Sequence, residues 1–285
     1  MARRRRGPRT RQARRQGGKS LAIALAVVTV ALLAAVLLLA RHGGAGPATG
    51  NTGLALIADG LSEDYPNTTL INELKHILEE AGFKVVVKEG RQVNLKLYEE
   101  LTKYSIVILR VHGGIALEYT PQGVEYFGGI FTGLPWRNNY TRLGEERYVA
   151  KARPLLAPHK LYVAVLPRFF QEKLQGRFPN QSVMIVSACW ATADPKTIAA
   201  LFNHGLGMYI GWNHKVTVKH ADQALYLLVK YALQELRSGK PWYQAWEDAV
   251  YKVNTRLGPD PQTHALLFYA LHSHYTSTTP ADQNK

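Results

Sequence analysis

The stretches SIVILRVHGG (residues 105–114) and SVMIVSACW (residues 182–190) decide the fold class of this 285-residue chain. Each is a continuous apolar run, rich in β-branched residues, that ends in small or chemically reactive side chains. Strands that are apolar on both faces are typical of a parallel sheet covered on both sides. We therefore expect both stretches to be buried strands of one sheet.

Strand-like and helix-like segments alternate on either side of these two stretches, which predicts an α/β fold with a mostly parallel sheet flanked by helices on both faces. Helices are expected at 68–81, 95–104, 195–202, 219–237 and 241–255, the third opened by an Asp-Pro cap. The region between residues 112 and 179 is less regular. Further strands are expected at 54–59, 83–90, 205–212 and 264–271, with short ones at 129–132, 147–150 and 161–166.

Most of the net charge of +14 belongs to the start of the chain. Nine of the 35 Lys and Arg side chains precede Ser20, with no acidic residue among them. A nucleic-acid-binding domain is expected to carry a basic stripe on its folded part, and no basic cluster follows residue 41. We therefore expect a basic cytoplasmic tail at 1–20 and no nucleic-acid partner.

Residues 21–40 (LAIALAVVTVALLAAVLLLA) carry no charge, and Thr29 is their only polar side chain. Twenty helical residues rise about 30 Å, which matches the apolar core of a bilayer. The preceding arginines predict a single-pass cell-membrane protein with a cytoplasmic N-terminus and an extracytoplasmic folded part. A cleaved signal peptide is the alternative, but its apolar region is usually only about 7–15 residues long.

The predicted organisation is therefore a membrane helix, a linker at 41–53, a folded domain at 54–275 and a disordered tail at 276–285. Cys189 is the only cysteine, so the domain has no internal disulfide. Its thiol is either a small buried hydrophobe or a reactive group.

His112-Gly113 and Cys189 each follow an apolar strand, at the sheet edge where parallel folds gather their chemistry. If the two strands are neighbours, the imidazole can take the proton of the thiol. The N–H groups of Gly113 and Cys189 would then bind a developing oxyanion. The alternative interpretation is a buried cysteine and a plain glycine turn.

Four other residues are candidate substrate-binding or orienting groups. Asp59 ends the first expected strand, where it would orient His112, bind substrate or cap the next loop. Trp190 follows the cysteine, and Trp212 and Asn213 follow a later strand, where they would wall a substrate pocket. The sequence predicts no cofactor and no metal site.

The blocks ILRVHGG (108–114) and VMIVSACWA (183–191) resemble the His-Gly and Ala-Cys blocks of the caspase-like cysteine peptidases (clan CD). That group includes caspases, legumain, gingipains, clostripain and the CHAT domains. The segments GLGMYIGWNHKV (205–216) and GKPWYQAWEDAV (239–250) are similar to the closing elements of CHAT and gingipain-like domains. No subfamily matches, and residues 116–180 match no known insertion.

The resemblance implies an enzyme that hydrolyses a peptide or protein substrate, with Cys189 as nucleophile and His112 as general acid and base. It also implies that Gly113 and Cys189 supply the oxyanion N–H groups. Members that cut after basic residues often carry an Asp beside the nucleophile, whereas Ser187 and Trp190 stand there in this chain. Two alternatives remain. One is a non-catalytic extracytoplasmic binding module with the same fold, and the other is a glutamine-amidotransferase-like hydrolase, whose Gly-x-Cys-x-Gly elbow is missing.

Overall fold

The computed structural model describes residues 53–120, 123–154 and 159–275, which belong to one compact unit. The expected basic tail, membrane helix, most of the linker and the C-terminal tail lie outside these residues. Across the described ranges, no helix combines the length and the apolar character needed to cross a bilayer.

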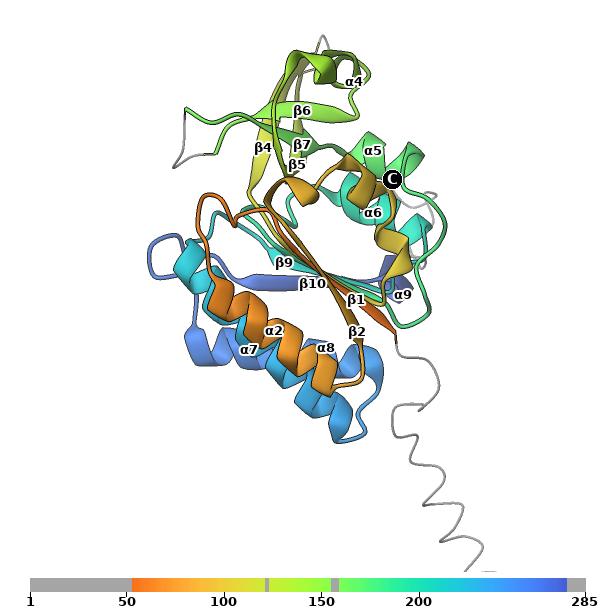
Figure 1. Ribbon diagram of the computed structural model, residues 1–285, viewed down its shortest axis with the longest axis vertical. Coiled ribbons are helices and arrows are strands. Elements are labelled where there is room, and N and C mark those ends of the chain that lie inside the picture. Colours follow the sequence, from red (N-terminus) through yellow and green to blue (C-terminus); the bar gives the residue numbers. More distant parts are fainter. Residues whose placement is uncertain (1–52, 121–122, 155–158, 276–285) are drawn as a thin grey trace, which may run out of the picture. The chain divides into compact units, whose positions relative to one another are not determined.

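A six-stranded sheet with the order β10-β9-β8-β3-β1-β2 forms the centre of the fold (Figure 1). All neighbouring strands run parallel except β10, which runs antiparallel to β9 at one edge. The six strands differ in burial: the four inner ones are almost completely buried, as their apolar sequences predict, and the two at the edges, β2 and β10, are partly exposed. They are β1 (Leu54–Asp59), β2 (Lys84–Glu89), β3 (Ile106–Arg110), β8 (Val183–Ser187), β9 (Met208–Trp212) and β10 (Leu267–Leu271).

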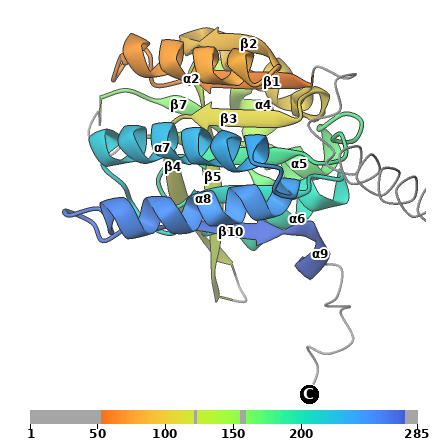
Figure 2. The same ribbon diagram turned by 90° about the horizontal axis from the view of Figure 1, so that it is seen from below.

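Three long helices lie side by side across one face of this sheet (Figure 2). Their apolar sides and the alternate residues of the strands form one core, which includes Leu74, Ile108, Ile185 and Trp246. The Asn67 side chain caps the first of these helices by accepting from the Leu70 N–H. The three helices are α2 (Thr68–Glu80), α7 (Val218–Arg237) and α8 (Trp242–Leu257).

Shorter helices cover part of the opposite face. The Asp194 side chain accepts from the Lys196 N–H at the start of α6, and Pro195 occupies its first turn, as predicted. The expected helix at 95–104 is interrupted at Glu100, and a 3₁₀ turn follows. The helical segments outside the first face are η1 (Gly90–Gln92), α3 (Leu95–Glu99), η2 (Leu101–Lys103), η3 (Asn138–Tyr140), α4 (Thr141–Glu145), α5 (Pro167–Glu172), α6 (Pro195–Asn203) and α9 (His272–Tyr275).

A second, antiparallel sheet is formed by the irregular region between β3 and β8, and the sequence did not predict it as a unit. Its order is β4-β5-β7-β6, and Figure 1 shows it on the side of the main sheet away from α2, α7 and α8. Ile130, Val163 and Val165 of this sheet pack into a second hydrophobic core, separate from the one beneath α2, α7 and α8. We call it the inserted sheet; its strands are β4 (Gly113–Thr120), β5 (Gly123–Pro135), β6 (Val149–Ala152) and β7 (Tyr162–Val165).

Candidate functional site

His112 and Cys189 follow two strands that are direct neighbours in the main sheet. β3 and β8 pair in parallel, with Arg110 opposite Ser187. The Val111 N–H extends this pairing by donating to the Ser187 carbonyl over 3.3 Å. His112 and Cys189 therefore follow adjacent strands at the same edge of the sheet, which is the condition that the sequence-based hypothesis required.

Gly113 lies directly against the backbone of Cys189. A Cβ atom at position 113 would lie only 2.2 Å from the Cys189 carbonyl oxygen and 3.2 Å from its nitrogen, so no larger residue fits without movement. Gly113 pairs with Ile130, and the Phe131 N–H donates to the His112 carbonyl. This pattern places Gly113 at a non-hydrogen-bonded position of the β4–β5 ladder, so its N–H points away from β5.

The imidazole of His112 is held by a carboxylate and three aromatic rings. Its Nε2 lies 2.9 Å from Asp64 Oδ2, and 17% of the side chain is exposed. The ring centroids of Tyr65, Phe131 and Tyr162 lie 6.1, 5.9 and 5.9 Å away. Burial lowers the pKa of His112 below its usual value, although the hydrogen bond and charge of Asp64 oppose this shift.

Asp64 is the one orienting carboxylate that the sequence analysis missed. Its side chain is only 4% exposed and also accepts from the Tyr162 hydroxyl at 2.8 Å and from the Lys160 ammonium. Burial alone would raise the pKa of Asp64, but the hydrogen bonds from Lys160, His112 and Tyr162 lower it below its usual value. The ionised carboxylate only accepts, so the neutral form of His112 is assigned its proton on Nε2, with Nδ1 unprotonated.

The Cys189 sulfur contacts the backbone of the β9–α7 loop. Sγ lies 3.4 Å from the Val216 nitrogen, which donates to it, and 3.6 Å from the Val216 oxygen, which it contacts as donor. Burial raises the pKa of this thiol. The next residue, Trp190, has a left-handed backbone with φ of 54°, which is rare for a bulky residue. Its N–H donates to the His214 carbonyl and its ring lies 5.6 Å from the His214 ring.

A buried carboxylate fixes the same loop from the other side. Asp260 is fully buried, and its Oδ2 accepts from the Thr217 N–H at 2.9 Å and from the Thr217 hydroxyl at 2.6 Å. Its Oδ1 accepts from the backbone of Gln262 and Thr263. Burial would raise the pKa of Asp260, but these four donors lower it to about 2. The position of Val216 beside the sulfur is therefore fixed through its neighbour.

Asp59 does not reach His112, which corrects its expected orienting role. It pairs in register with Arg110, and its Oδ1 accepts from Arg110 Nη1 at 2.8 Å and from the Leu61 N–H at 3.0 Å. Arg110 is 1% exposed and also donates to both carboxylate oxygens of Asp222, at 2.7 and 2.9 Å. Asp59 therefore caps the loop that follows β1, which was one of its expected roles. It also completes a buried ion cluster with Arg110 and Asp222.

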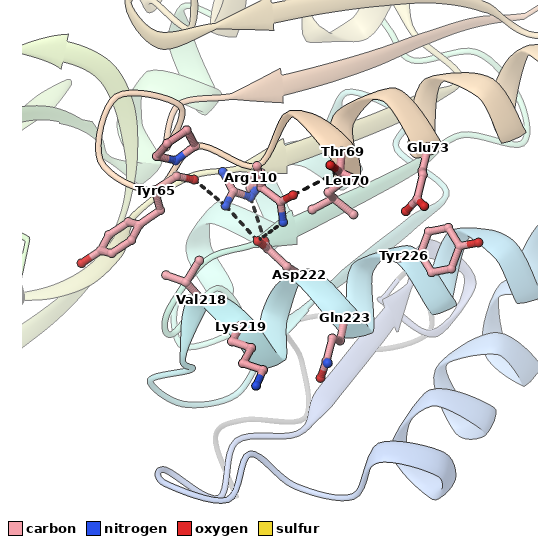
Figure 3. Close-up of a pocket in the computed structure, with 12 residues that line it drawn as sticks. Tyr65, Thr69, Leu70, Glu73, Arg110, Val218, Lys219, Asp222, Gln223 and Tyr226 are labelled. Carbon is pink, nitrogen blue, oxygen red and sulfur yellow. Dashed lines mark hydrogen bonds and ion pairs between the residues drawn. The ribbon is translucent and has the colours of Figure 1, made fainter.

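A pocket of about 500 Å³ opens between α2 and α7, beside this cluster (Figure 3). Arg110 contributes to its lining and is joined there to the Asp222 carboxylate from α7. Tyr65 lines the pocket and its ring also contacts His112, while Val218 lines it two residues beyond Val216. The other lining residues are Pro66, Asn67, Thr69, Leu70, Glu73, Lys219, Gln223 and Tyr226.

The three other expected pocket residues occupy different environments. Trp212 is 2% exposed and packs in the core with its ring 5.5 Å from that of His220, so it does not line a surface pocket. Its position inside β9 explains this, because the side chain points into the core under α7. Trp190 is half-buried beside the cysteine. Asn213 is exposed and accepts from the Leu266 N–H at 2.9 Å, which joins the end of β9 to the segment before β10.

The chain matches no protein-family model. No curated protein is significantly similar to it either. In the part of the chain that the structure describes, no three His, Cys, Asp or Glu side chains are grouped closely enough to hold a metal ion.

The geometry thus places Cys189 and His112 at the ends of neighbouring strands, with Asp64 bound to the imidazole; the pocket between α2 and α7 is lined by none of the three and adjoins His112 through Tyr65. Sequence reasoning found the first two because each directly follows an apolar strand. It missed Asp64, which lies in the loop between β1 and α2, five positions beyond the residue expected to orient His112. An acidic residue in that loop was the only available signal, and the sequence does not show which of Asp59, Glu63 and Asp64 turns toward His112.

Proposed function

We propose that this chain is a caspase-like cysteine peptidase in which Cys189 attacks the peptide carbonyl and His112, oriented by Asp64, moves the proton. The observation that supports this most strongly is the pairing of β3 with β8 and the close contact of Gly113 with Cys189. A strand order that puts the two residues at opposite edges would have removed the basis for the proposal.

The proposed reaction begins when the Cys189 sulfur leaves Val216 and turns toward the imidazole. The thiol proton passes to Nδ1 of His112, since Nε2 donates to Asp64, and the sulfur forms a bond to the carbonyl carbon. The N–H groups of Gly113 and Cys189 stabilise the oxyanion. The C–N bond then breaks, His112 returns the proton to the leaving amine, and water hydrolyses the thioester.

We also propose that residues 21–40 anchor the chain in the cell membrane, with residues 1–20 in the cytoplasm and the α/β domain on the extracytoplasmic side. The support is the length of the apolar segment and the arginines before it. Protease added to intact cells should degrade the domain but leave an N-terminal epitope tag intact. Protection of the domain would contradict this topology.

An acyloxymethyl-ketone probe on the full-length chain, purified in detergent, tests the peptidase proposal. The wild type should be labelled at Cys189, and Cys189→Ala should abolish labelling. His112→Ala should slow labelling by about 100-fold or more, because a positioned general base typically contributes about 10²–10⁴ to the rate. His76→Ala, which changes an exposed histidine on α2, is the matched control. Labelling that persists in Cys189→Ala would overturn the assignment of the nucleophile.

One observation favours a second candidate function, a non-catalytic binding module with the same fold. The sulfur is turned to the Val216 backbone, and burial raises the thiol pKa. This alternative predicts that no peptide in a combinatorial library is cleaved and that the probe labels no residue, while the folded protein still binds a partner. Cleavage that depends on Cys189 would exclude it.

A further inference from the structure

The inserted sheet contacts the His112 imidazole with the rings of Phe131 and Tyr162, and it also reaches His112 through hydrogen bonds to Asp64. Tyr162 opens β7, and Lys160 lies just before that strand. Both side chains donate to Asp64, which comes from the β1–α2 loop on the other side of the imidazole. Asp64 therefore accepts hydrogen bonds from His112, which follows β3 of the main sheet, and from Lys160 and Tyr162 at the start of β7.

The three donors are distributed unequally over the two oxygens of the Asp64 carboxylate. Tyr162 and His112 donate to the same oxygen, Oδ2, at 2.8 and 2.9 Å, whereas Lys160 donates to Oδ1. Each carboxylate oxygen offers two lone pairs, so Tyr162 and His112 together occupy both acceptor positions of Oδ2, and its negative charge interacts with two donors rather than with His112 alone. The positive charge of Lys160 also interacts with the same carboxylate through a charge-assisted hydrogen bond.

We propose that Lys160 and Tyr162 are positioning residues through which the inserted sheet holds Asp64 in place and limits how strongly that carboxylate stabilises the charged form of His112. This inference rests on the proposed function of His112 as the base. Its consequence, together with burial, is that more of His112 is neutral and able to accept the thiol proton beside the carboxylate. An imidazole paired with an unshared carboxylate would instead be charged over more of the neutral pH range.

Other influences on the imidazole act beside this one, and burial is the largest cause of its lowered pKa. Tyr65 and Phe131 contact it as rings, and Cys189 comes from the neighbouring strand. Arg110 lies two residues earlier in β3 and its charge also lowers the pKa of His112, although Asp59 and Asp222 pair with it. Glu63, an exposed neighbour of Asp64, acts on Lys160 and Tyr162 rather than on His112 directly.

The test is a titration of the His112 imidazole by NMR in the full-length protein, with ¹³C-labelled histidine and the His112 signal assigned from a His112→Gln variant. Asp64→Asn should lower the pKa of His112 by about 1, because it removes an adjacent opposite charge. Lys160→Met should raise that pKa by about 0.5, since a partly screened positive charge is lost. Tyr162→Phe should also raise it, because Oδ2 then serves His112 alone.

A general loss of structure would raise the pKa of His112 in all three variants, toward the value of an exposed histidine, so the lowering expected in Asp64→Asn and the rescue by Lys160→Arg distinguish positioning from it. Lys160→Arg should restore the wild-type value. The matched controls lie on or next to β6 of the inserted sheet: Lys151→Met removes an exposed lysine of that strand, and Tyr148→Phe, just before it, removes a hydroxyl that donates to Glu172. Neither should move the pKa of His112.

The inference is overturned if Lys160→Met and Tyr162→Phe leave the pKa of His112 at the wild-type value or lower it. The proposed function is tested separately by probe labelling of the same samples. Absent labelling with the expected pKa shifts would reject the peptidase and keep the role of the inserted sheet. Labelling without those pKa shifts would support the peptidase and reject the role of the inserted sheet.

Discussion

The imidazole half and the thiol half of the candidate site are each fixed by a buried carboxylate, but in different ways. Asp64 acts on His112 directly through a side-chain hydrogen bond. Asp260 acts on Cys189 indirectly, because it holds Thr217, and the neighbouring Val216 backbone contacts the sulfur. The imidazole is thus set by charged side chains, and the thiol by a loop.

This difference indicates that the thiol half, rather than the imidazole half, must move in the proposed reaction. His112 already has Nε2 engaged and Nδ1 free to accept a proton. Cys189 must exchange the Val216 contact for one with the imidazole, which needs a rotation of its side chain or a shift of the β9–α7 loop. Three predictions test this comparison.

The largest effect is expected where the two halves meet. Gly113→Ala places a methyl group 2.2 Å from the Cys189 carbonyl oxygen, so the backbone of one half must move. Displacing a reacting group by about 1 Å costs about 100-fold in rate, and we expect at least this loss in probe labelling. Gly114→Ala is the matched control, because its nearest neighbour is 3.5 Å away. Equal labelling of the two variants would show that the halves are not in contact.

A smaller effect, on stability, is expected from Asp260→Asn. The pKa of Asp260 is about 2 in the folded protein, against about 3.8 when unfolded, so its ionised form stabilises the fold by about 2 kcal/mol at pH 7. This contribution is present above the unfolded pKa and is lost as the pH falls toward 2.

Denaturant unfolding of wild type and variant at several pH values measures this contribution. The difference in unfolding free energy should be about 2 kcal/mol at pH 7 and should shrink below pH 4. Asp248→Asn removes a partly exposed carboxylate on α8 and should cost less than about 0.5 kcal/mol. A difference that stays constant down to pH 2 would contradict the role of the charge.

The smallest effect concerns the resting thiol. Because burial raises the pKa of Cys189, less thiolate is present at pH 7 than in a free cysteine, and iodoacetamide should react a few-fold more slowly with the folded protein than with the unfolded chain. The rate should rise with pH through that raised pKa. Folded protein that reacts faster than a free thiol at pH 6 would show that the sulfur already contacts His112.

Most of the main sheet could be predicted from the sequence because its strands are continuous apolar runs between amphipathic helices. The functional hypothesis required β3 and β8 to be neighbours. A local sequence pattern does not reveal the order of strands in a sheet, so this could not be predicted. Three strands of the inserted sheet were expected as short segments and β4 was not expected, since the pairing of this sheet joins Gly113 to Ile130 and Val149 to Val165 across irregular segments. Trp212 was placed wrongly because strand position alone did not reveal that it faces the core.

The candidate site could be predicted as far as its two reactive side chains. Their supports, Asp64, Lys160, Tyr162 and Asp260, lie in loops or on strands far apart in the sequence and carry no local signal. Hydrogen bonds between distant segments depend on the folded backbone, which explains why sequence reasoning chose Asp59 instead.

The position of the inserted sheet within the chain also bears on how this protein folds. β3 is made before the inserted sheet, and β8 after it, yet the two strands pair along their whole length. Contacts between such distant segments form late, because the intervening chain must first become ordered. The reactive pair would therefore come together near the end of folding, and a nascent chain that ends before β8 would hold an imidazole with no thiol to activate.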